Sequence, residues 1–283
     1  MAVIDAWHSL MHMIPFSWTK YTFMNNSLLA VLLITPLFAL LGTMVVSNRM
    51  VFFTEVLGHS ALTGIAIGVI LGFYEPTLPM VVLAIILAAA INMVKNIIKS
   101  SMDTVLGVFF AFIVSLGIVI LSRQGGFVKY TNYLIGDVLA VSQNDLIWLA
   151  GIFIFVVIYW YIVSNALILT SINTSLARSR LINTSFVELS FSIVLAVVVM
   201  MSIRLVGILI VNSLLVLPAA SSRNFAKNIH MYTLWAVIIS IFSGVTGLIL
   251  SYYWLAASGA TIVLVASICF ILSILSAKFV HKY

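Results

Sequence analysis

Residues 27–47 read SLLAVLLITPLFALLGTMVVS, an apolar run that contains no charged side chain. A helix needs about 20 such residues to cross the roughly 30 Å hydrocarbon core of a bilayer, where it satisfies its own backbone hydrogen bonds. The stretch therefore predicts a transmembrane helix, and similar runs recur along the whole chain.

The composition of the 283-residue chain excludes a water-soluble protein. Hydrophobic residues make up 64% and charged residues 7% of the sequence, against about 45–50% and about 25% in soluble domains. These values exclude a soluble enzyme, a disulfide scaffold and a disordered tail, and Cys269 stands alone, so no intrachain disulfide can form. Because the apolar runs are long and continuous, they favour membrane helices over a β-barrel.

About nine segments, within a range of eight to ten, have the length and hydropathy of membrane spans. We predict an all-α polytopic membrane protein with spans near 27–47, 52–72, 77–94, 104–122, 146–164, 186–202, 205–222, 231–252 and 258–277. The number is approximate because only a short link at Arg204 separates the sixth segment from the seventh.

Positive charges in the loops predict the orientation of the chain, because cytoplasmic loops are enriched in Lys and Arg. One set of alternate loops holds Arg49, Lys95, Lys99, Arg178, Arg180, Arg223, Lys227, Lys278 and Lys282, and the other holds Lys20, Arg123, Lys129 and Arg204. We therefore place the first set and the C-terminus in the cytoplasm, and an odd number of spans puts the N-terminus outside. The net charge of +6 then reflects topology, and we expect no nucleic-acid partner.

The segment 54–72, TEVLGHSALTGIAIGVILG, combines a polar stripe with a stripe of glycines. Glu55 and His59 are four residues apart and share one helix face, which Thr63 extends. Roughly the opposite side carries residues small enough for close approach of another helix: Gly64, Gly68 and Gly72. Ionisable side chains are costly inside a bilayer, so the polar stripe indicates a water-filled or ion-lined path.

A carboxylate and an imidazole together suit a borderline divalent cation such as Zn²⁺, Mn²⁺ or Fe²⁺. We predict that Glu55 and His59 bind such a metal. A structural Glu–His hydrogen bond that locks two helices explains the spacing equally well. Two ligands do not complete a coordination shell, so water or other helices must supply the rest.

Other polar residues within the spans are weaker candidates. Several could line a path but more often make hydrogen bonds between helices: Asn92, Ser115, Asn212 and Ser213. Another group predicts close helix packing through small side chains: Ser240, Ser243, Gly244 and Gly247. His8 and His12 are also four residues apart, but an interfacial helix flanked by Trp7 and Trp18 explains them better than metal capture.

Motifs of soluble catalysis are absent from the sequence. It contains no G-x-x-x-x-G-K-[ST], H-E-x-x-H or G-x-S-x-G motif. We therefore expect no enzymatic activity, no covalently bound cofactor and no ATP binding by this chain itself.

Five segments in order along the chain resemble the membrane permease subunits of metal-ion ABC importers, the zinc, manganese and iron type. They are NRM at 48–50, EVLGHSALTGIAIG at 55–68, DTVLG at 103–107, YLIGDVLAVS at 133–142 with Asp145, and VGILIVNSLLVLPAA at 206–220. That family usually carries Asp where this chain has Glu55, so its metal preference could differ.

The resemblance implies a type II ABC importer-like fold in which residues 1–283 form a single transmembrane permease domain. It also implies a homodimer or close heterodimer, a cytoplasmic ABC ATPase dimer and an extracytoplasmic metal-binding protein, all in or at the bacterial cytoplasmic (inner) membrane with its lipid. In such permeases an acid and a His at the spacing of Glu55 and His59 hold the metal in transit.

The polar connection 165–185 is the predicted cytoplasmic coupling region that docks on the ATPase. It is rich in Ser, Asn and Thr and carries Arg178 and Arg180 on the cytoplasmic side. The family resemblance adds Asn173 and Ala177 to this region, with Asn173 at a position where the family usually has an acid.

These observations predict an ATP-driven importer permease for Zn²⁺, with Mn²⁺ or Fe²⁺ as the alternatives within the same family. An alternative from a different class is a proton-coupled secondary transporter that uses Glu55 and His59 as proton carriers. A permease for a chelated metal needs a wide path, and the Glu/His stripe favours a bare ion.

Overall fold

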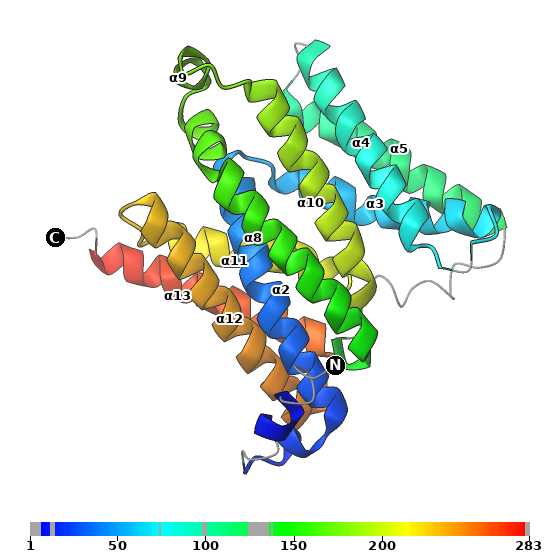
Figure 1. Cartoon of the computed structure of the whole chain (residues 1–283), viewed down its shortest axis with the longest axis vertical. Coiled ribbons are helices and arrows are strands. Elements are labelled where there is room, and N and C mark those ends of the chain that lie inside the picture. The colour runs from blue at the N-terminus through cyan, green and yellow to red at the C-terminus, as the bar shows by residue number, and fades with distance from the viewer. Residues whose placement is uncertain are drawn as a thin grey trace. The chain divides into compact units, whose positions relative to one another are not determined.

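The structure is a computed structural model that describes residues 7–11, 15–73, 75–97, 101–123, 136 and 138–280 (Figure 1). Its elements are η1 Trp18–Lys20, α2 Thr22–Ser47, α3 Val51–Ile70, α4 Thr77–Ile97, α5 Met102–Arg123, η2 Val138–Ala140, α8 Gln143–Ile172, α9 Thr174–Ser179, α10 Thr184–Val206, α11 Ile208–Arg223, α12 Ile229–Trp254 and α13 Ser258–Val280. Every element within these described residues is helical, which confirms the all-α prediction.

Eight of the described helices are long and apolar enough to cross a membrane: α2, α3, α4, α5, α8, α10, α12 and α13. Each of the nine segments predicted as spans coincides with one of the helices. The ninth, α11, has 16 residues, and at about 1.5 Å per residue it is about 24 Å long. It is the shortest of the nine, and the eight longer helices lie within the predicted range of eight to ten spans. The orientation predicted from the loop charges counts α11 as the ninth crossing.

The boundary between α10 and α11 lies at Gly207 and not at Arg204 as predicted. Gly207 has φ +86, a conformation that glycine adopts without the steric penalty of a Cβ. Its N–H still bonds to the carbonyl of Ile203, so α10 runs through Arg204 to Val206 before the chain turns. The charged residue lies in the last turn of the helix, and the glycine after it ends the helix.

The predicted coupling region 165–185 begins within α8, which continues to Ile172. The hydroxyl of Thr170 donates to the carbonyl of Ala166, and that of Ser171 donates to Ile168. Since these side chains bond back to their own helix, their polarity does not require a loop. The connection between α8 and α10 is thus residues 173–183, with α9 inside it.

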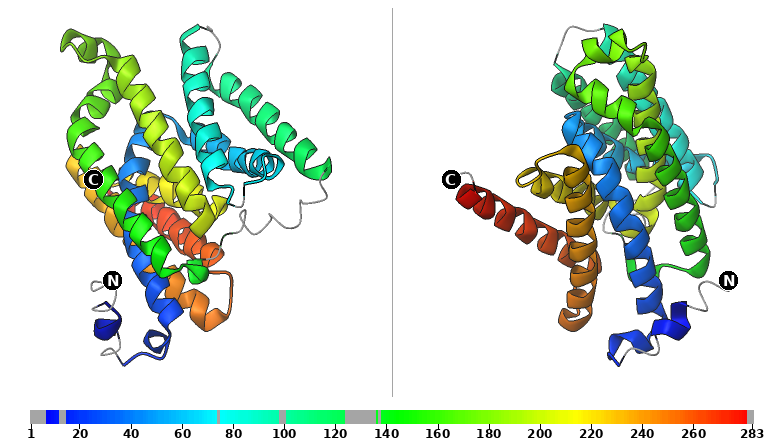
Figure 2. Two further views of the ribbon diagram at one scale, coloured as in Figure 1. Left: turned by 45° about the vertical axis from the view of Figure 1, so that its right-hand side comes forward. Right: turned by 60° about the vertical axis from the view of Figure 1, so that its left-hand side comes forward.

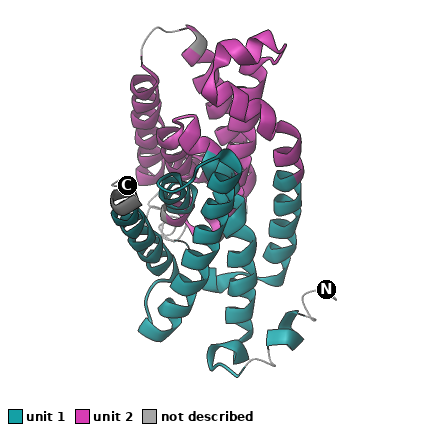
Figure 3. Ribbon diagram, turned by 90° about the vertical axis from the view of Figure 1, so that its left-hand side faces the viewer, with its two compact units in different colours: residues 1–43, 136–157, 213–283 teal, residues 44–135, 158–212 magenta. Residues whose placement is uncertain are grey.

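The chain forms two compact units, coloured separately in Figure 3. Unit 1 comprises residues 1–43, 136–157 and 213–283, and unit 2 comprises residues 44–135 and 158–212. Part of the fourth resembling segment, residues 133–135 and 137, lies outside the described residues.

Small residues hold the helices of unit 1 close together. A Cβ on Gly247 would lie 2.5 Å from the Cα of Ile262, which places α12 directly on α13 (Figure 2). A Cβ on Gly244 would lie 2.5 Å from the side chain of Thr35 on α2, and the Ser240 hydroxyl donates to the Thr35 carbonyl over 2.9 Å. These contacts confirm the predicted packing role of this stripe.

In unit 2, α3 packs against α4, α5 and α10. Its glycines work as predicted at two positions: Cβ atoms on Gly64 and Gly68 would lie within 3.2 Å of Met80 and Pro79 at the start of α4. Gly72 does not continue this stripe, because it follows the end of α3 with φ +76 and has no described atom within 4 Å of a Cβ position.

One ion pair lies at each end of α10 and connects it to α4 or to the residues just before α4. Lys95 at the end of α4 contacts Glu188 near the start of α10 over 2.6 Å, and Arg204 at the other end of α10 contacts Glu75 over 3.0 Å. Glu188 and Arg204 are about 24 Å apart along an ideal helix. Such exposed pairs contribute little stability, but they mark the two ends of an apolar segment with nearly the thickness of a bilayer core.

Candidate metal-ion site

Glu55 and His59 lie on the partly open face of α3. Most of this helix is buried in unit 2, including Thr54, Val56 and Ser60. By contrast, the side chains of Glu55 and His59 are 42% and 36% exposed. The predicted shared face is therefore observed, and it is the face that is accessible to an ion.

The two side chains lie close together without a hydrogen bond between them. Nε2 of His59 lies 3.7 Å from Oε2 of Glu55, beyond the usual hydrogen-bond range. The structural alternative raised from the sequence, a Glu–His hydrogen bond, is thus not made here. A carboxylate oxygen and an imidazole nitrogen at this separation leave room for a cation to be bound by both.

Asn212 of α11 provides the hydrogen bond that Glu55 does make. Its Nδ2 donates to Oε2 of Glu55 over 3.0 Å, and the residue is only 7% exposed. A Cβ on Gly58 would lie 3.2 Å from Nδ2 and 3.4 Å from Oδ1 of the same amide. Gly58 therefore creates the space in which the Asn212 amide lies against α3, within one turn of both site residues.

An aromatic ring borders the other side of His59. The ring of Phe110 on α5 meets the imidazole edge to face, with centroids 5.2 Å apart and an interplanar angle of 86°. Phe110 also contacts Phe52, with centroids 6.1 Å apart. Such packing restricts the imidazole to few orientations, which favours a fixed coordination direction.

Thr63, expected to extend the polar stripe, does not line the site. It is fully buried, and its hydroxyl donates to the carbonyl of Ile113 on α5. A Cβ on Gly117 would lie 2.5 Å from that hydroxyl. Thr63 thus holds α3 against α5, a packing role that the period of the helix alone does not reveal.

The site is incomplete as a coordination shell. Among the described residues, no group of three or more His, Cys, Asp and Glu side chains could hold a metal ion. In the weaker candidate pair of His8 and His12, Nε2 of His8 is hydrogen-bonded to Oδ1 of Asn26 over 2.9 Å. His12 lies outside the described residues. Within the part of the chain that the structure describes, further ligands for an ion at Glu55 and His59 must therefore be amide, hydroxyl or water oxygens, or come from another chain.

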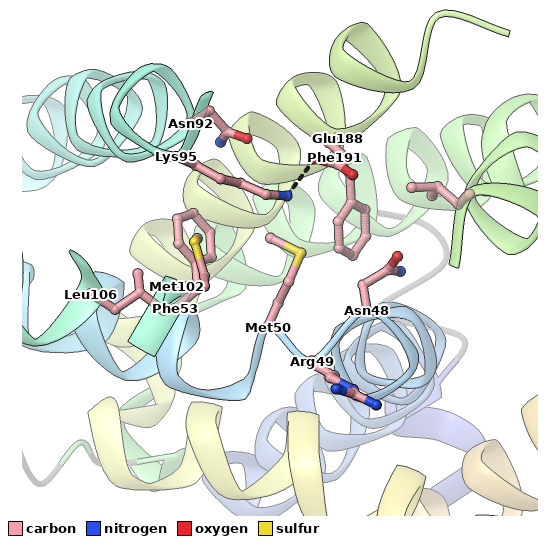
Figure 4. Close-up of a pocket in the computed structure, with 11 residues that line it drawn as sticks. Asn48, Arg49, Met50, Phe53, Asn92, Lys95, Met102, Leu106, Glu188 and Phe191 are labelled. Atoms are coloured by element: carbon pink, nitrogen blue, oxygen red, sulfur yellow. Dashed lines mark hydrogen bonds and ion pairs between the residues drawn. The ribbon is translucent and has the colours of Figure 1, made fainter. Parts of the chain in front are cut away.

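A small pocket of about 60 Å³ lies at the Arg49 end of unit 2 (Figure 4). Figure 4 shows Lys95 reaching Glu188, with Arg49 on another wall of the pocket. Sequence analysis counted both cations as loop charges and did not identify Glu188 as a partner. The volume suits a few water molecules and is far below that of a site for an organic ligand.

The predicted coupling region is built around α9. Asn173 caps this helix, because its Oδ1 accepts hydrogen bonds from the N–H groups of Ser175 and Leu176 over 2.9 and 3.1 Å. Asn and Asp are equally good N-caps, which explains why an amide can replace the acid expected here. Ala177, the other residue that the family resemblance adds to this region, is fully buried within the chain.

The two arginines of the coupling region differ in their surroundings. Nε of Arg178 donates to the hydroxyl of Thr184 over 3.4 Å, which links α9 to the start of α10. Arg180 is exposed at the C-terminal end of α9. Beside it, Leu181 has φ +60 and is 96% exposed. An apolar side chain in this position is the feature that sequence analysis missed.

Comparison with known proteins gives relatives along nearly the whole chain. It is 35% identical over 253 residues to the high-affinity zinc uptake system membrane protein ZnuB of Haemophilus influenzae, covering 88% of this chain and 95% of the relative. It is 28% identical to the manganese import system permease protein ScaB of Streptococcus gordonii, covering 89% of this chain and 91% of the relative.

The fold also matches a solved structure, PsaBC from Streptococcus pneumoniae in complex with Fab. The TM-score is 0.77 at 22% identity, with 92% of this chain and 91% of the other covered. The sequence model of the ABC 3 transport family matches residues 20–277. The chain therefore belongs to the ABC 3 transport family and is the multi-pass membrane permease subunit of a bacterial metal-ion ABC uptake system, which works with separate ATPase and binding-protein partners.

Proposed function

We propose that this permease carries Zn²⁺ and that Glu55 and His59 hold the ion in transit. The observation that carries the proposal is the placement of a carboxylate and an imidazole on one accessible helix face, with Oε2 and Nε2 3.7 Å apart. Zinc is bound in proteins by this combination of oxygen and nitrogen ligands. The relative named as a zinc uptake protein supports the same ion.

Manganese is the second candidate substrate. A relative named as a manganese import permease is 28% identical to this chain. Mn²⁺ prefers oxygen ligands more than Zn²⁺ does, and the Glu55 carboxylate provides such a ligand. Fe²⁺ accepts the same donor set as both ions, and no described residue favours it specifically.

The coupling region of residues 173–183 is the proposed docking surface for the ATPase. Its support is the short capped helix α9 and the exposed Arg180 and Leu181. We place this region, the C-terminus and the other loops rich in Lys and Arg in the cytoplasm, following the distribution of positive charge.

A second copy of this chain, or a close relative, is the proposed partner within the membrane. The helix face that carries Glu55 and His59 is partly open. In α5 and α8, only 28% and 17% of the most apolar 18-residue stretch is buried within the chain. These faces would meet lipid and the second permease. The site would then lie where two copies contribute ligands to one ion.

Transport measurements on the complete importer test the proposal. The permease is assembled with its ATPase and binding protein in proteoliposomes, and uptake of radioactive zinc and manganese is followed with and without ATP. ATP-dependent uptake of zinc in preference to manganese supports the proposal. Uptake driven by a proton gradient without ATP, or uptake of manganese alone, would reject it.

A further inference from the structure

The Asn212 amide has one end that is hydrogen-bonded and one that is not. Nδ2 donates to Glu55, whereas Oδ1 has no hydrogen-bond partner within the part of the chain that the structure describes. The residue is more than nine-tenths buried. A buried carbonyl oxygen without a partner is unfavourable, and in native proteins such an atom calls for an explanation.

The position of this oxygen relates it to the ion site. Both ends of the amide lie over Gly58, between the turns of α3 that carry Glu55 and His59. The amide therefore contacts Glu55 and lies over the residue that precedes His59, and all of these residues belong to unit 2. An oxygen acceptor at this place fits the missing part of a coordination shell that has one carboxylate and one imidazole.

We propose that Asn212 is a third protein ligand of the transported ion, which it binds through Oδ1. The inference rests on the proposed transit site at Glu55 and His59 and adds a residue to it. In the ion-free site the N–H group faces the carboxylate because the carboxylate is an acceptor. When a divalent cation is bound to the carboxylate, rotation of the amide about its terminal torsion turns Oδ1 towards the ion in place of Nδ2. The NH₂ group and the oxygen are nearly equal in size, so the rotation needs little extra space.

The chemistry of an amide oxygen predicts an effect on metal preference. Carbonyl oxygens are common ligands of harder ions such as Mn²⁺, whereas Zn²⁺ is bound mainly by Cys, His and carboxylates. Asn212 should therefore contribute more to the affinity for Mn²⁺ than to that for Zn²⁺. Its loss should shift the permease towards zinc.

A purely structural role makes a different prediction from that of a ligand. If Asn212 only anchors Glu55 by its N–H group, Asn212→Asp removes the donor and places a second negative charge beside the carboxylate. Metal binding should then fall as far as in Asn212→Leu. If Asn212 is a ligand, Asn212→Asp keeps the oxygen and adds charge that attracts a cation, so binding should be retained or strengthened.

The experiment measures Mn²⁺ binding to the assembled permease and ATPase without nucleotide. Bound ions are counted by the loss of the electron paramagnetic resonance signal of free Mn²⁺, and Zn²⁺ is measured by competition. The matched control is Asn224→Leu, since Asn224 also makes a helix-to-helix hydrogen bond, to Ser273 over 2.7 Å, but in unit 1. Gly58→Ala keeps Asn212 but places a methyl group about 3.2 Å from its amide nitrogen, a contact that requires a shift of a few tenths of an ångström.

We expect Asn212→Leu and Gly58→Ala to weaken Mn²⁺ binding by about tenfold or more and to weaken Zn²⁺ binding less. Asn212→Asp should bind Mn²⁺ at least as well as the wild type. The control Asn224→Leu should bind as the wild type does. Weak binding by Asn212→Asp, or unchanged binding by Asn212→Leu, overturns the inference. Wild-type binding by the Glu55→Gln, His59→Ala double variant would instead overturn the transit site itself.

Discussion

The amide of Asn212 donates a hydrogen bond to the carboxylate of Glu55 over 3.0 Å, although the two residues lie 157 positions apart in the chain. This contact joins α11 to α3 beside His59. It also means that Glu55 is held in place from one side while remaining 42% exposed on the other. The site is thus oriented by the protein and still open to an ion.

The capping role of Asn173 predicts a graded effect on coupling. Asn173→Ala removes the acceptor for two backbone N–H groups of α9 and should cost about 1 kcal/mol of local stability, whereas Asn173→Asp keeps the cap. We expect Asn173→Ala to lower transport-coupled ATP hydrolysis and Asn173→Asp to retain it. The measurement is the rate of ATP hydrolysis by the assembled transporter with its binding protein. Equal rates for both variants would mean that the cap has no part in coupling.

Leu181 should contribute to ATPase docking. It is 96% exposed at φ +60, and Asp tolerates this conformation, so Leu181→Asp changes the surface without straining the backbone. Leu255 is a matched control, because it is 94% exposed at φ +51 but lies after α12 on the predicted external side. We expect Leu181→Asp to reduce co-purification of the ATPase severalfold and Leu255→Asp to leave it unchanged. A larger effect at Leu255 would reverse the proposed orientation.

Gly247 should be far less tolerant of a methyl group than Gly151. A Cβ on Gly247 would lie 2.5 Å from the backbone of Ile262, so Gly247→Ala should destabilise unit 1 by about 1–3 kcal/mol. Gly151 lies in α8 with no described atom within 4 Å of its Cβ position, and Gly151→Ala should be neutral or slightly stabilising. Thermal unfolding of the detergent-solubilised variants compares them. A lower midpoint for Gly151→Ala than for Gly247→Ala would contradict the packing of α12 on α13.

Metal binding should weaken as the pH falls. A proton competes with the ion for the imidazole nitrogen and the carboxylate, because both groups must be deprotonated to bind a metal. We therefore expect the Kd for Zn²⁺ of the assembled transporter, measured without its binding protein, to rise from neutral to mildly acidic pH. The dependence should be reduced in His59→Ala. A Kd that does not change with pH would argue against an imidazole ligand.

Local patterns in the sequence were sufficient for the helices and for the shared face of Glu55 and His59. The period of a helix depends only on residues a few positions apart, so it can be read directly. The partner of Glu55 could not be identified in this way, because the contact of Asn212 with α3 depends on tertiary packing. Asn212 was noted only as one of several polar residues in the spans.

Errors in the sequence analysis arose where the hydrogen-bond partner of a polar side chain could not be read from the sequence pattern. Thr170 and Ser171 bond to their own helix, so α8 extends beyond its predicted end. Thr63 lies four residues after His59 on the predicted polar face, yet its hydroxyl donates a hydrogen bond to a carbonyl of α5. In each case composition indicated polarity or function, whereas the three-dimensional partner decided the role.

ATP-driven zinc uptake by the Glu55→Gln, His59→Ala double variant tests the transit site most directly. Glu55→Gln keeps the shape of the side chain without its charge, and His59→Ala removes the nitrogen ligand, so the anionic ligand and the imidazole are both lost. The variant is first shown to insert in the membrane and to assemble with its ATPase to the wild-type extent. We predict that uptake of radioactive zinc into proteoliposomes then falls to the level seen without ATP. Near-normal uptake by the well-assembled double variant would contradict the account.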